Sequence, residues 1–293
     1  MNLSDFIIEK EIVLLDGAIG TQLEIHDSVM GGQSNLITPD IVLDIHREYS
    51  KTGCNIITAN TLTMNRVFIE GHNLDVDVRA VNLKGVELAK NAARHEQFVL
   101  GDMSSTGKLL EPYGPVSESE AFDSYREQAS ILEEGGVNGF IIETMIDLNE
   151  ALCALRACRE VSNLPVLTAM SFSTSKDGGR TVMGNSAEEC AKVLTEAGAS
   201  GIGANCGNVD PFEMAEIISV ISASTELPVI AMPNAGKPEM VNDRLLFNMS
   251  PSDYVKGIKE CIKAGARIVG GCCGTTPEHI SVLDENLGLG SRE

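Results

Sequence analysis

The sequence predicts an α/β protein folded as a closed (β/α)8 barrel, the TIM barrel. Eight short apolar runs rich in β-branched residues alternate with longer helical patterns from one end of the chain to the other. The runs are continuously apolar rather than alternating with polar residues, as expected for parallel strands buried on both faces. No linker or shift in composition interrupts the alternation, and barrels of this kind commonly have about 250 residues. We therefore expect residues 1–293 to form a single domain.

The expected strands leave room for a helix after each of them. We place the strands at residues 12–16, 55–60, 97–103, 139–144, 165–172, 201–206, 228–234 and 267–273. Most of these runs end on a polar side chain or a cysteine. The carboxyl ends of all strands of a barrel meet on one rim, where the active sites of this fold lie. That rim is expected to gather Asp16, Asn60, Asp102, Glu143, Ser171, Asn205, Cys206, Asn234, Cys272 and Cys273.

Capping residues mark where the expected helices begin and end. A capping residue precedes a proline, which is favoured at the first helical position, at Thr38, Asp210, Ser250 and Thr276. A glycine follows a long helical stretch, as at a helix C-terminus, at Gly53, Gly136, Gly198 and Gly265. The second, fourth, sixth and eighth strands each end seven to eight residues after one of these glycines. This weak repeat fits a barrel, in which alternate strands fill common layers.

Composition and charge exclude several classes of protein. The formal net charge of −20 argues against a nucleic-acid partner, because phosphates attract basic surfaces. No apolar run reaches the roughly 20 residues that a membrane span needs, and the first residues lack the basic and apolar regions of a signal peptide. We therefore expect a cytoplasmic protein that acts on neither nucleic acid nor a membrane. In that compartment the eight cysteines are expected to be thiols rather than disulfides.

Three of the cysteines lie at strand ends, and we interpret them as ligands of one metal ion. Cys206 ends the sixth strand, and Cys272 and Cys273 end the eighth. Successive residues of a strand point to opposite faces, so the paired cysteines share an ion only if the backbone bends there. We expect the neighbouring residues Gly270, Gly271 and Gly274 to give the chain that freedom. The other five are expected to be small buried residues: Cys54, Cys153, Cys158, Cys190 and Cys261.

A set of three sulfur ligands favours zinc and leaves one coordination position open. Water, a weak protein oxygen or a substrate thiol would fill that position, and a coordinated thiol is deprotonated at neutral pH. Asn234 ends the seventh strand and either caps its loop or lends an oxygen to the metal when substrate is absent. The contrasting hypothesis is a structural zinc site with four protein ligands, but no fourth cysteine or histidine ends an expected strand. His279 is expected to be a surface or capping residue.

The turn after the first strand is a candidate site for an amino acid. Gly17 and Gly20 allow backbone N–H groups to converge on an anion such as a carboxylate. Asp16 and Glu143 end the first and fourth strands and are free to accept hydrogen bonds from an ammonium group. Together these residues would hold an amino acid by both ends. The alternative is that the two glycines only form a turn.

Several motifs form a pattern that runs through nearly the whole chain. They lie at residues 15–21, 59–61, 101–108, 143–144, 205–206, 233–238 and 271–279. From about residue 12 to residue 285, this pattern resembles the homocysteine S-methyltransferase family, and the paired cysteines with the upstream Asn-Cys are its most specific part. The Pro-Asn-Ala-Gly-Lys-Pro and Thr-Gly-Lys segments are most similar to the N-terminal homocysteine-binding module of cobalamin-dependent methionine synthase.

The resemblance implies a TIM barrel that transfers a methyl group to the thiol of homocysteine, which gives methionine. It implies that Cys206, Cys272 and Cys273 hold zinc and that the homocysteine sulfur joins them. These cysteines are thus the expected catalytic and metal-binding residues. Asn234 matches a position proposed to cover the zinc when substrate is absent.

The resemblance also implies how the rest of homocysteine binds. Its amino group would meet the carboxylates of Asp16 and Glu143. Its carboxylate would meet the backbone N–H groups that follow Asp16, those of Gly17 and Ala18. These four residues are the expected substrate-binding residues.

The methyl donor is expected to be a methylcorrinoid, such as methylcobalamin, on a separate protein, since no folate-binding, cobalamin-binding or reactivation module follows residue 293. Two segments depart from the family pattern. Residues 62–64 stand where the family usually continues with phenylalanine, and residues 104–105 replace its Gly-Pro. Both face the place where the donor should approach. The alternatives are S-methylmethionine or betaine as donor, or a methyltransferase component that acts on another thiol or methyl donor.

Overall fold

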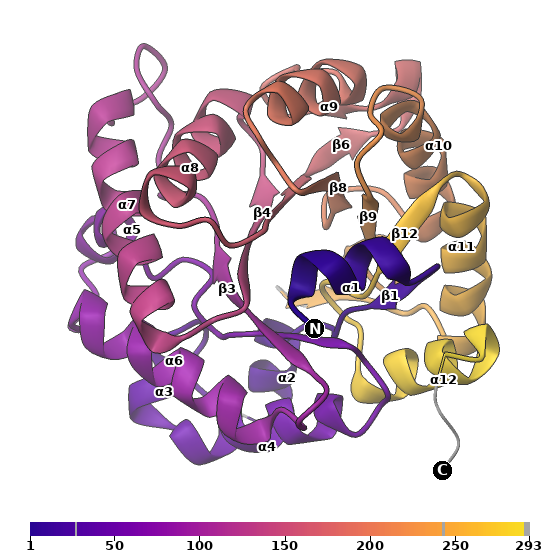
Figure 1. Ribbon diagram of the computed structural model, residues 1–293, viewed down its shortest axis with the longest axis horizontal. Helices are drawn as coiled ribbons and strands as arrows, with labels where there is room; N and C mark the ends of the chain where they lie inside the picture. Colours follow the sequence, from indigo (N-terminus) through magenta and orange to yellow (C-terminus); the bar gives the residue numbers. More distant parts are fainter. Residues whose placement is uncertain (27, 242–243, 290–293) are drawn as a thin grey trace.

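All eight expected strands are present, and they form one parallel barrel (Figure 1). The structure is a computed structural model that describes residues 1–26, 28–241 and 244–289. The barrel order is β1-β12-β9-β8-β5-β4-β3-β2, and a bridge between Leu15 and Ile56 closes it. The predicted (β/α)8 class is therefore confirmed. The strands are β1 Val13–Leu14, β2 Ile56–Thr58, β3 Phe98–Met103, β4 Gly139–Met145, β5 Val166–Met170, β8 Gly201–Asn205, β9 Val229–Met232 and β12 Ala266–Val269.

Helices surround the barrel strands (Figure 1). They are α2 Gly20–Ile25, α3 Ser34–Ile37, α4 Pro39–Ser50, α5 Arg66–Gly71, α6 Val78–Ala92, α7 Glu118–Gly135, α8 Leu148–Val161, α9 Ala187–Glu196, α10 Pro211–Ser222, α11 Pro251–Lys263 and α12 Pro277–Leu287. The glycines expected at helix ends all have positive φ, as a C-terminal cap requires: Gly53, Gly136, Gly198 and Gly265. None of the helices in the described residues is long and apolar enough to span a membrane.

Two of the four expected helix starts are capped by the side chain that the sequence indicates. Asp210 and Ser250 accept hydrogen bonds from backbone N–H groups in the first turns of α10 and α11. His279 Nδ1 lies 3.3 Å from the Thr276 nitrogen, which donates to it, so the capping role is confirmed. The alternative that His279 is a surface residue is wrong, because only 6% of it is exposed. The side chain of Thr38 does not cap α4, because its hydroxyl bonds a neighbouring serine instead.

Two separate apolar cores fill the barrel interior and the layer between strands and helices. Leu100 of β3 and Ile141 of β4 belong to the inner core. Side chains two residues apart on a strand point the same way, so Asp102 and Glu143 also point inward, nearer the carboxyl ends of the strands. This alternation places polar groups inside the C-terminal mouth of the barrel.

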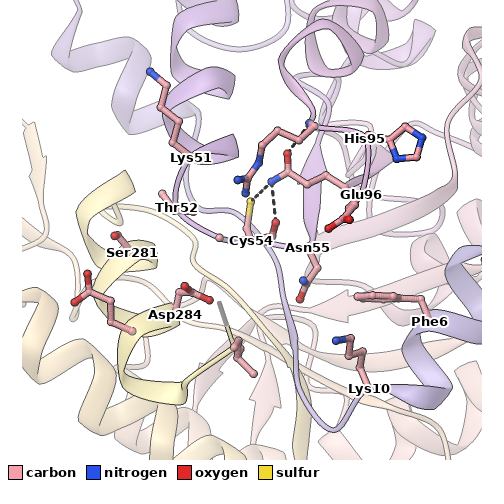
Figure 2. A pocket seen from close by; sticks show the side chains of 15 residues that line it. Phe6, Lys10, Lys51, Thr52, Cys54, Asn55, His95, Glu96, Ser281 and Asp284 are labelled. Carbon is pink, nitrogen blue, oxygen red and sulfur yellow. Dashed lines mark hydrogen bonds between the residues drawn. The ribbon is translucent and has the colours of Figure 1, made fainter. Parts of the chain in front are cut away.

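The helix α1 Leu3–Glu9 lies across the N-terminal end of the barrel (Figure 1). Its residues Leu3 and Ile7 join the inner core, and Arg267 Nη2 donates to the Lys10 carbonyl at 2.6 Å. A cavity of about 650 Å³ lies on the same side and is lined by polar groups that include Lys51 and Asp284 (Figure 2). In this fold the N-terminal end supports stability and the C-terminal end supports chemistry.

Longer connections stand at the C-terminal ends of the strands. Residues 172–181 form the hairpin β6 Phe172–Thr174 and β7 Arg180–Thr181, and a second hairpin comprises β10 Glu239–Val241 and β11 Arg244–Leu246. The expected strand 165–172 is therefore too long, because β5 ends at Met170 and the chain then pairs with itself.

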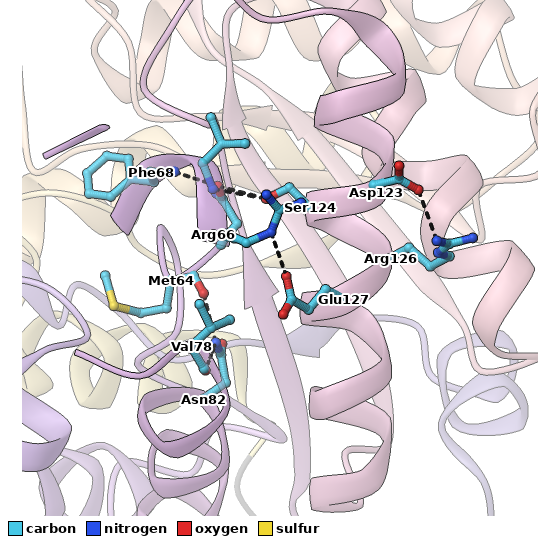
Figure 3. Close-up of polar contacts among 11 residues, drawn as sticks. Met64, Arg66, Phe68, Val78, Asn82, Asp123, Ser124, Arg126 and Glu127 are labelled. Carbon is cyan, nitrogen blue, oxygen red and sulfur yellow. Dashed lines mark hydrogen bonds and ion pairs between the residues drawn. The ribbon is translucent and has the colours of Figure 1, made fainter. Parts of the chain in front are cut away.

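The connection between β2 and α6 is fixed to α6 and α7 by polar contacts (Figure 3). Arg66 Nε lies 3.0 Å from Glu127 Oε2, and Asn82 Nδ2 donates to the Met64 carbonyl at 2.8 Å. These contacts hold residues 62–63 at the mouth of the barrel, where they line a cavity.

Candidate functional site

The three cysteines expected to bind a metal converge at the C-terminal mouth of the barrel. The Sγ atoms of Cys206, Cys272 and Cys273 lie within 4.8 Å of one another. Those of Cys206 and Cys273 are 3.8 Å apart. In a tetrahedral site with Zn–S bonds of about 2.3 Å, two sulfur atoms are separated by roughly 3.8 Å. The sulfur atoms thus have the spacing that a zinc ion needs.

The backbone bend that the sequence requires is present at both strand ends. Cys206 has a φ of +53°, a left-handed conformation that is uncommon for a residue other than glycine. β12 ends before the paired cysteines, and the Cys272 N–H bonds a carbonyl beyond the end of β9. Of the three glycines expected to supply freedom, only Gly274 has a positive φ, +79°. Gly271 is needed for space instead, because a Cβ there would lie 2.4 Å from Thr275 Oγ1.

The three sulfur atoms interact strongly with one another. Hydrogen bonds from the Cys272 and Cys273 thiols hold the pKa of Cys206 well below its usual range. The same bonds to Cys206 raise the pKa values of Cys272 and Cys273. Of the three cysteines, Cys206 is therefore the one whose neighbours favour the thiolate, the form that binds metals.

Asn234 lies beside this cluster and is only 1% exposed. Its Nδ2 donates to the Gly207 carbonyl at 3.0 Å, so the side chain holds the loop that follows Cys206. Its Oδ1 is buried without a hydrogen-bond partner among the described residues. Buried carbonyl oxygens rarely lack a donor, so this atom fits a group that meets a metal or a ligand.

Asp16 is almost fully buried at the end of the first strand, with 3% of its surface exposed. Its carboxylate accepts hydrogen bonds from the Thr58 N–H at 2.9 Å and the Thr58 hydroxyl at 3.0 Å. Burial raises the pKa of Asp16 to about 7, although the Thr58 bonds oppose this shift. A carboxylate has about four lone-pair sites, so Asp16 keeps capacity for a ligand.

Glu143 points into the same cavity from β4, and Asn205 connects it to the cysteines. Burial, followed by the charges of Cys206 and Asp16, raises the pKa of Glu143 to about 8. Asn205 Nδ2 lies 3.4 Å from Glu143 Oε2 and 3.7 Å from Cys272 Sγ. Sequence reasoning placed Asn205 at the rim without giving it a role. The weak sequence repeat could have indicated that Asn205 contacts the end of the fourth strand, because it places residues 143–144 and 205–206 at equivalent ends of alternate strands.

The turn after Asp16 is held by a distant threonine. The Ala18 N–H donates to Thr275 Oγ1 at 3.1 Å, and a Cβ on Gly17 would lie 2.6 Å from the same hydroxyl. A carboxylate that binds at Ala18 must therefore share this N–H with the threonine or displace the hydroxyl. Gly20 begins α2.

A cavity of about 190 Å³ lies between these groups. It is smaller than the cavity at the other end of the barrel, but it lies where this fold places its chemistry. Asn234 does not line it. Predicted residues from four strand ends do line it: Asp16, Gly17, Ala18, Glu143, Cys206, Cys272 and Cys273. Sequence reasoning gave no role to two further lining residues, Thr58 and Asp102.

The remaining cysteines are buried thiols, as the sequence predicts. Burial raises the pKa values of Cys158, Cys190 and Cys261 to about 12. Thiols with such values are inert at neutral pH, because the reactive form is the thiolate.

Comparisons with known proteins extend over nearly the whole chain. The chain is 28% identical over 294 residues to the methionine synthase of Mycobacterium leprae, covering 93% of this chain and 24% of that protein. It is 27% identical over 295 residues to the methionine synthase of Mycobacterium tuberculosis, covering 94% and 24%. The chain therefore spans about a quarter of the length of these curated relatives.

A solved structure and a family model point to the same kind of protein as these relatives. The structure is similar to the metallated form of the homocysteine methyltransferase MmuM from Escherichia coli, with a TM-score of 0.78 and 19% identity over 96% of this chain and 98% of that one. At this identity the likeness shows a shared fold. The family model for homocysteine S-methyltransferase matches residues 13–287. The chain belongs to the homocysteine S-methyltransferase family.

Proposed function

We propose that this protein is a zinc-dependent enzyme that methylates homocysteine to methionine, with a methylcorrinoid on a separate protein as the methyl donor. The observation that carries the proposal is the spacing of the three cysteine sulfurs in a cavity that also holds buried carboxylates. Membership of the homocysteine S-methyltransferase family supports homocysteine as the acceptor.

In this proposal Cys206, Cys272 and Cys273 hold zinc. Asn234 offers its Oδ1, which has no hydrogen-bond partner among the described residues, when substrate is absent. When bound, zinc supplies the positive charge that keeps a substrate thiol deprotonated at neutral pH. The three cysteines set the position of the substrate sulfur at the mouth of the barrel.

The rest of the substrate is held by the first and fourth strands. Asp16 and Glu143 accept hydrogen bonds from the ammonium group, and the N–H groups of Gly17 and Ala18 hold the carboxylate. Fixing both ends of the amino acid orients its sulfur toward the donor, which lowers the entropic part of the barrier. A bond forms between sulfur and the methyl carbon while the methyl–donor bond breaks. The electron pair of the broken bond stays with the donor, and the thiol proton passes to solvent.

Sequence similarity supports a methylcorrinoid donor. The Thr-Gly-Lys and Pro-Asn-Ala-Gly-Lys-Pro segments resemble the cobalamin-dependent members of the family, and the chain is similar to two methionine synthases. A panel of methylcobalamin, S-methylmethionine and betaine with L-homocysteine separates the donor from the acceptor. Turnover with S-methylmethionine or betaine but not with methylcobalamin would replace the donor and leave the acceptor unchanged.

Zinc removal tests the central part of the proposal. We expect chelation to abolish methionine formation from L-homocysteine and added zinc to restore it. Cys206→Ser should lose most of its zinc, because it removes one of three thiolate ligands. Cys190→Ser is the matched control, since Cys190 is a buried thiol of α9 that does not belong to the cluster, and it should retain zinc. The measurements are metal content by elemental analysis and methionine by chromatography. Unchanged turnover after complete zinc removal would contradict the proposal.

A further inference from the structure

We infer that Asp102 is a third acceptor for the substrate ammonium group, beside Asp16 and Glu143, and that it makes the site selective for thiols with a free amino group. This inference rests on the proposed function, because it takes homocysteine as the ligand. It adds a substrate-binding residue and a basis for specificity to that site.

The backbone of Asp102 is fixed so that its side chain points into the cavity. Asp102 lies in β3, opposite Ile141 of β4, and two residues after the inner-core residue Leu100. The Thr61 hydroxyl accepts from the Asp102 N–H at 3.1 Å and donates to the Asp102 carbonyl at 2.8 Å. Both the strand direction and this pair of bonds hold the carboxylate at the cavity wall.

The carboxylate of Asp102 is buried and incompletely paired. Only 6% of the residue is exposed, and Oδ1 has no hydrogen-bond partner among the described residues. Burying an ionised carboxylate without a partner is strongly unfavourable, so such a group is either protonated or paired with a cation from a ligand. Burial, followed by the charges of Glu143 and Asp16, raises the pKa of Asp102 well above its usual value.

The protein does not supply that cation from the cavity wall. Three carboxylates line the cavity, those of Asp16, Asp102 and Glu143. No lysine, arginine or histidine is among the described residues that line it. Any of these carboxyl groups that is ionised must therefore be balanced by a positive charge from the ligand.

An α-ammonium group matches this arrangement in both charge and donor count. It has three N–H donors, as a lysine ammonium does, and the cavity offers three carboxylates. Asp16 already accepts from Thr58, and Glu143 Oε2 accepts from Asn205. Asp102 Oδ1 is thus a buried acceptor in the cavity wall whose capacity the described residues leave unused. A thiol that lacks the ammonium group leaves the carboxylates without a counter-charge.

The test is a double-mutant cycle between the protein and its ligand. Zinc-loaded wild-type protein and the Asp102→Asn variant are titrated by calorimetry with L-homocysteine and with 4-mercaptobutanoate, which lacks the amino group. A hydrogen bond to a charged group contributes enough that we expect Asp102→Asn to weaken L-homocysteine binding by about tenfold or more. Binding of 4-mercaptobutanoate should change by less than about twofold, because no ammonium is present to lose.

Asp284→Asn is the matched control. Asp284 Oδ1 is also buried without a partner among the described residues, but Asp284 lines the cavity at the other end of the barrel (Figure 2). The Asp284→Asn variant should bind both thiols with the affinity of the wild type.

An equal loss of affinity for both thiols in Asp102→Asn, or no loss of affinity for L-homocysteine, would overturn the inference. If the zinc-loaded wild-type protein binds neither thiol, the proposed function itself is wrong, and with it the inference that rests on it. Asp102→Ala, with metal content and melting temperature recorded, replaces Asp102→Asn if that variant does not fold.

Discussion

At the scale of single residues, Asn205 shows how an uncharged side chain organises the site. It is fully buried on β8, and its Oδ1 accepts from the Thr144 N–H at 2.7 Å across the intervening strand β5. Alternate strands of a barrel contribute to the same interior layer, which explains this contact. Thr144 has a φ of +60°, a strained conformation for a β-branched residue that costs about 1–3 kcal/mol. The Asn205 bonds help to offset that strain and fix the end of β4.

A second buried residue, His46, predicts a pH dependence of stability. It is fully buried in α4, and neither ring nitrogen has a partner among the described residues. Burial lowers the pKa of His46 from 6.5 to about 4. Between these two values the unfolded chain binds a proton that the folded protein does not. The free energy of unfolding therefore falls as the pH falls, by about 1.4 kcal/mol per pH unit and about 3 kcal/mol in total.

His46→Leu removes this contribution, because leucine fills much of the same space and does not titrate. We expect the variant to be at least as stable as the wild type at neutral pH. As the pH falls, its free energy of unfolding should exceed that of the wild type by an increasing amount. Urea unfolding of both proteins from about pH 7.5 to about pH 4.5 measures the difference. Comparing the two proteins cancels the opposite contributions of buried carboxylates such as Asp16. Parallel pH curves would refute the assignment.

At the scale of elements, the connection from β3 to α7 is anchored by one buried carboxylate of α8. Glu150 is 2% exposed. It accepts from the Thr106 N–H and hydroxyl, both at 2.7 Å, from the Ser105 hydroxyl, and from the Tyr125 hydroxyl at 3.0 Å. Ser104, which precedes Ser105 in this connection, donates a hydrogen bond from its hydroxyl to the Glu143 carbonyl at 2.7 Å. The connection is thus tied both to α8 and to the strand end that carries a candidate substrate contact.

Glu150→Gln should lower the free energy of unfolding by about 1–3 kcal/mol, because its amide NH₂ faces donors that need an acceptor. Tyr125→Phe removes only one of those donors and should cost about 1 kcal/mol. Chemical denaturation at neutral pH measures both values. Equal stability of Glu150→Gln and the wild type would show that the connection does not depend on this carboxylate.

At the scale of the whole molecule, the two ends of the barrel differ in the side chains they contain. The C-terminal end holds the sulfur cluster and the buried carboxylates, whereas α1 packs apolar side chains against the N-terminal end. The barrel interior between them is filled by side chains, so it is a packed core rather than a channel. Changes at the N-terminal end should therefore alter stability without altering metal binding.

Neighbouring isoleucines of α1 provide a matched pair for this expectation. Ile7 is 4% exposed and joins the inner core, whereas Ile8 is 70% exposed. Ile7→Ala should lower the free energy of unfolding by about 2–4 kcal/mol through the cavity it leaves. Ile8→Ala should change it by less than about 0.5 kcal/mol. Under the proposed function, both variants should have the same zinc content as the wild type. Loss of zinc from folded Ile7→Ala would show that the two ends are coupled.

The sequence by itself determined the class of fold, the presence of all eight strands and the three cysteines that meet at the mouth of the barrel. Strand runs, capping residues and the Gly-Gly-Cys-Cys-Gly motif are local patterns, so they can be read from neighbouring residues. The rim residues followed from one rule of the fold, that strand ends meet on one side. The hairpins above the rim and the early ends of β9 and β12 were not predictable in this way, because the chain there leaves the regular pattern.

Only the tertiary structure decided how the rim residues are paired. The bond from Ala18 to Thr275 joins residues 257 positions apart, and the bond from Asn205 to Thr144 joins residues 61 apart. Only the folded surroundings of Asp102 and Asn234 show that the Oδ1 atom of each has no hydrogen-bond partner among the described residues. Burial and hydrogen bonding depend on residues that the fold brings together, so no local pattern of the sequence contains them.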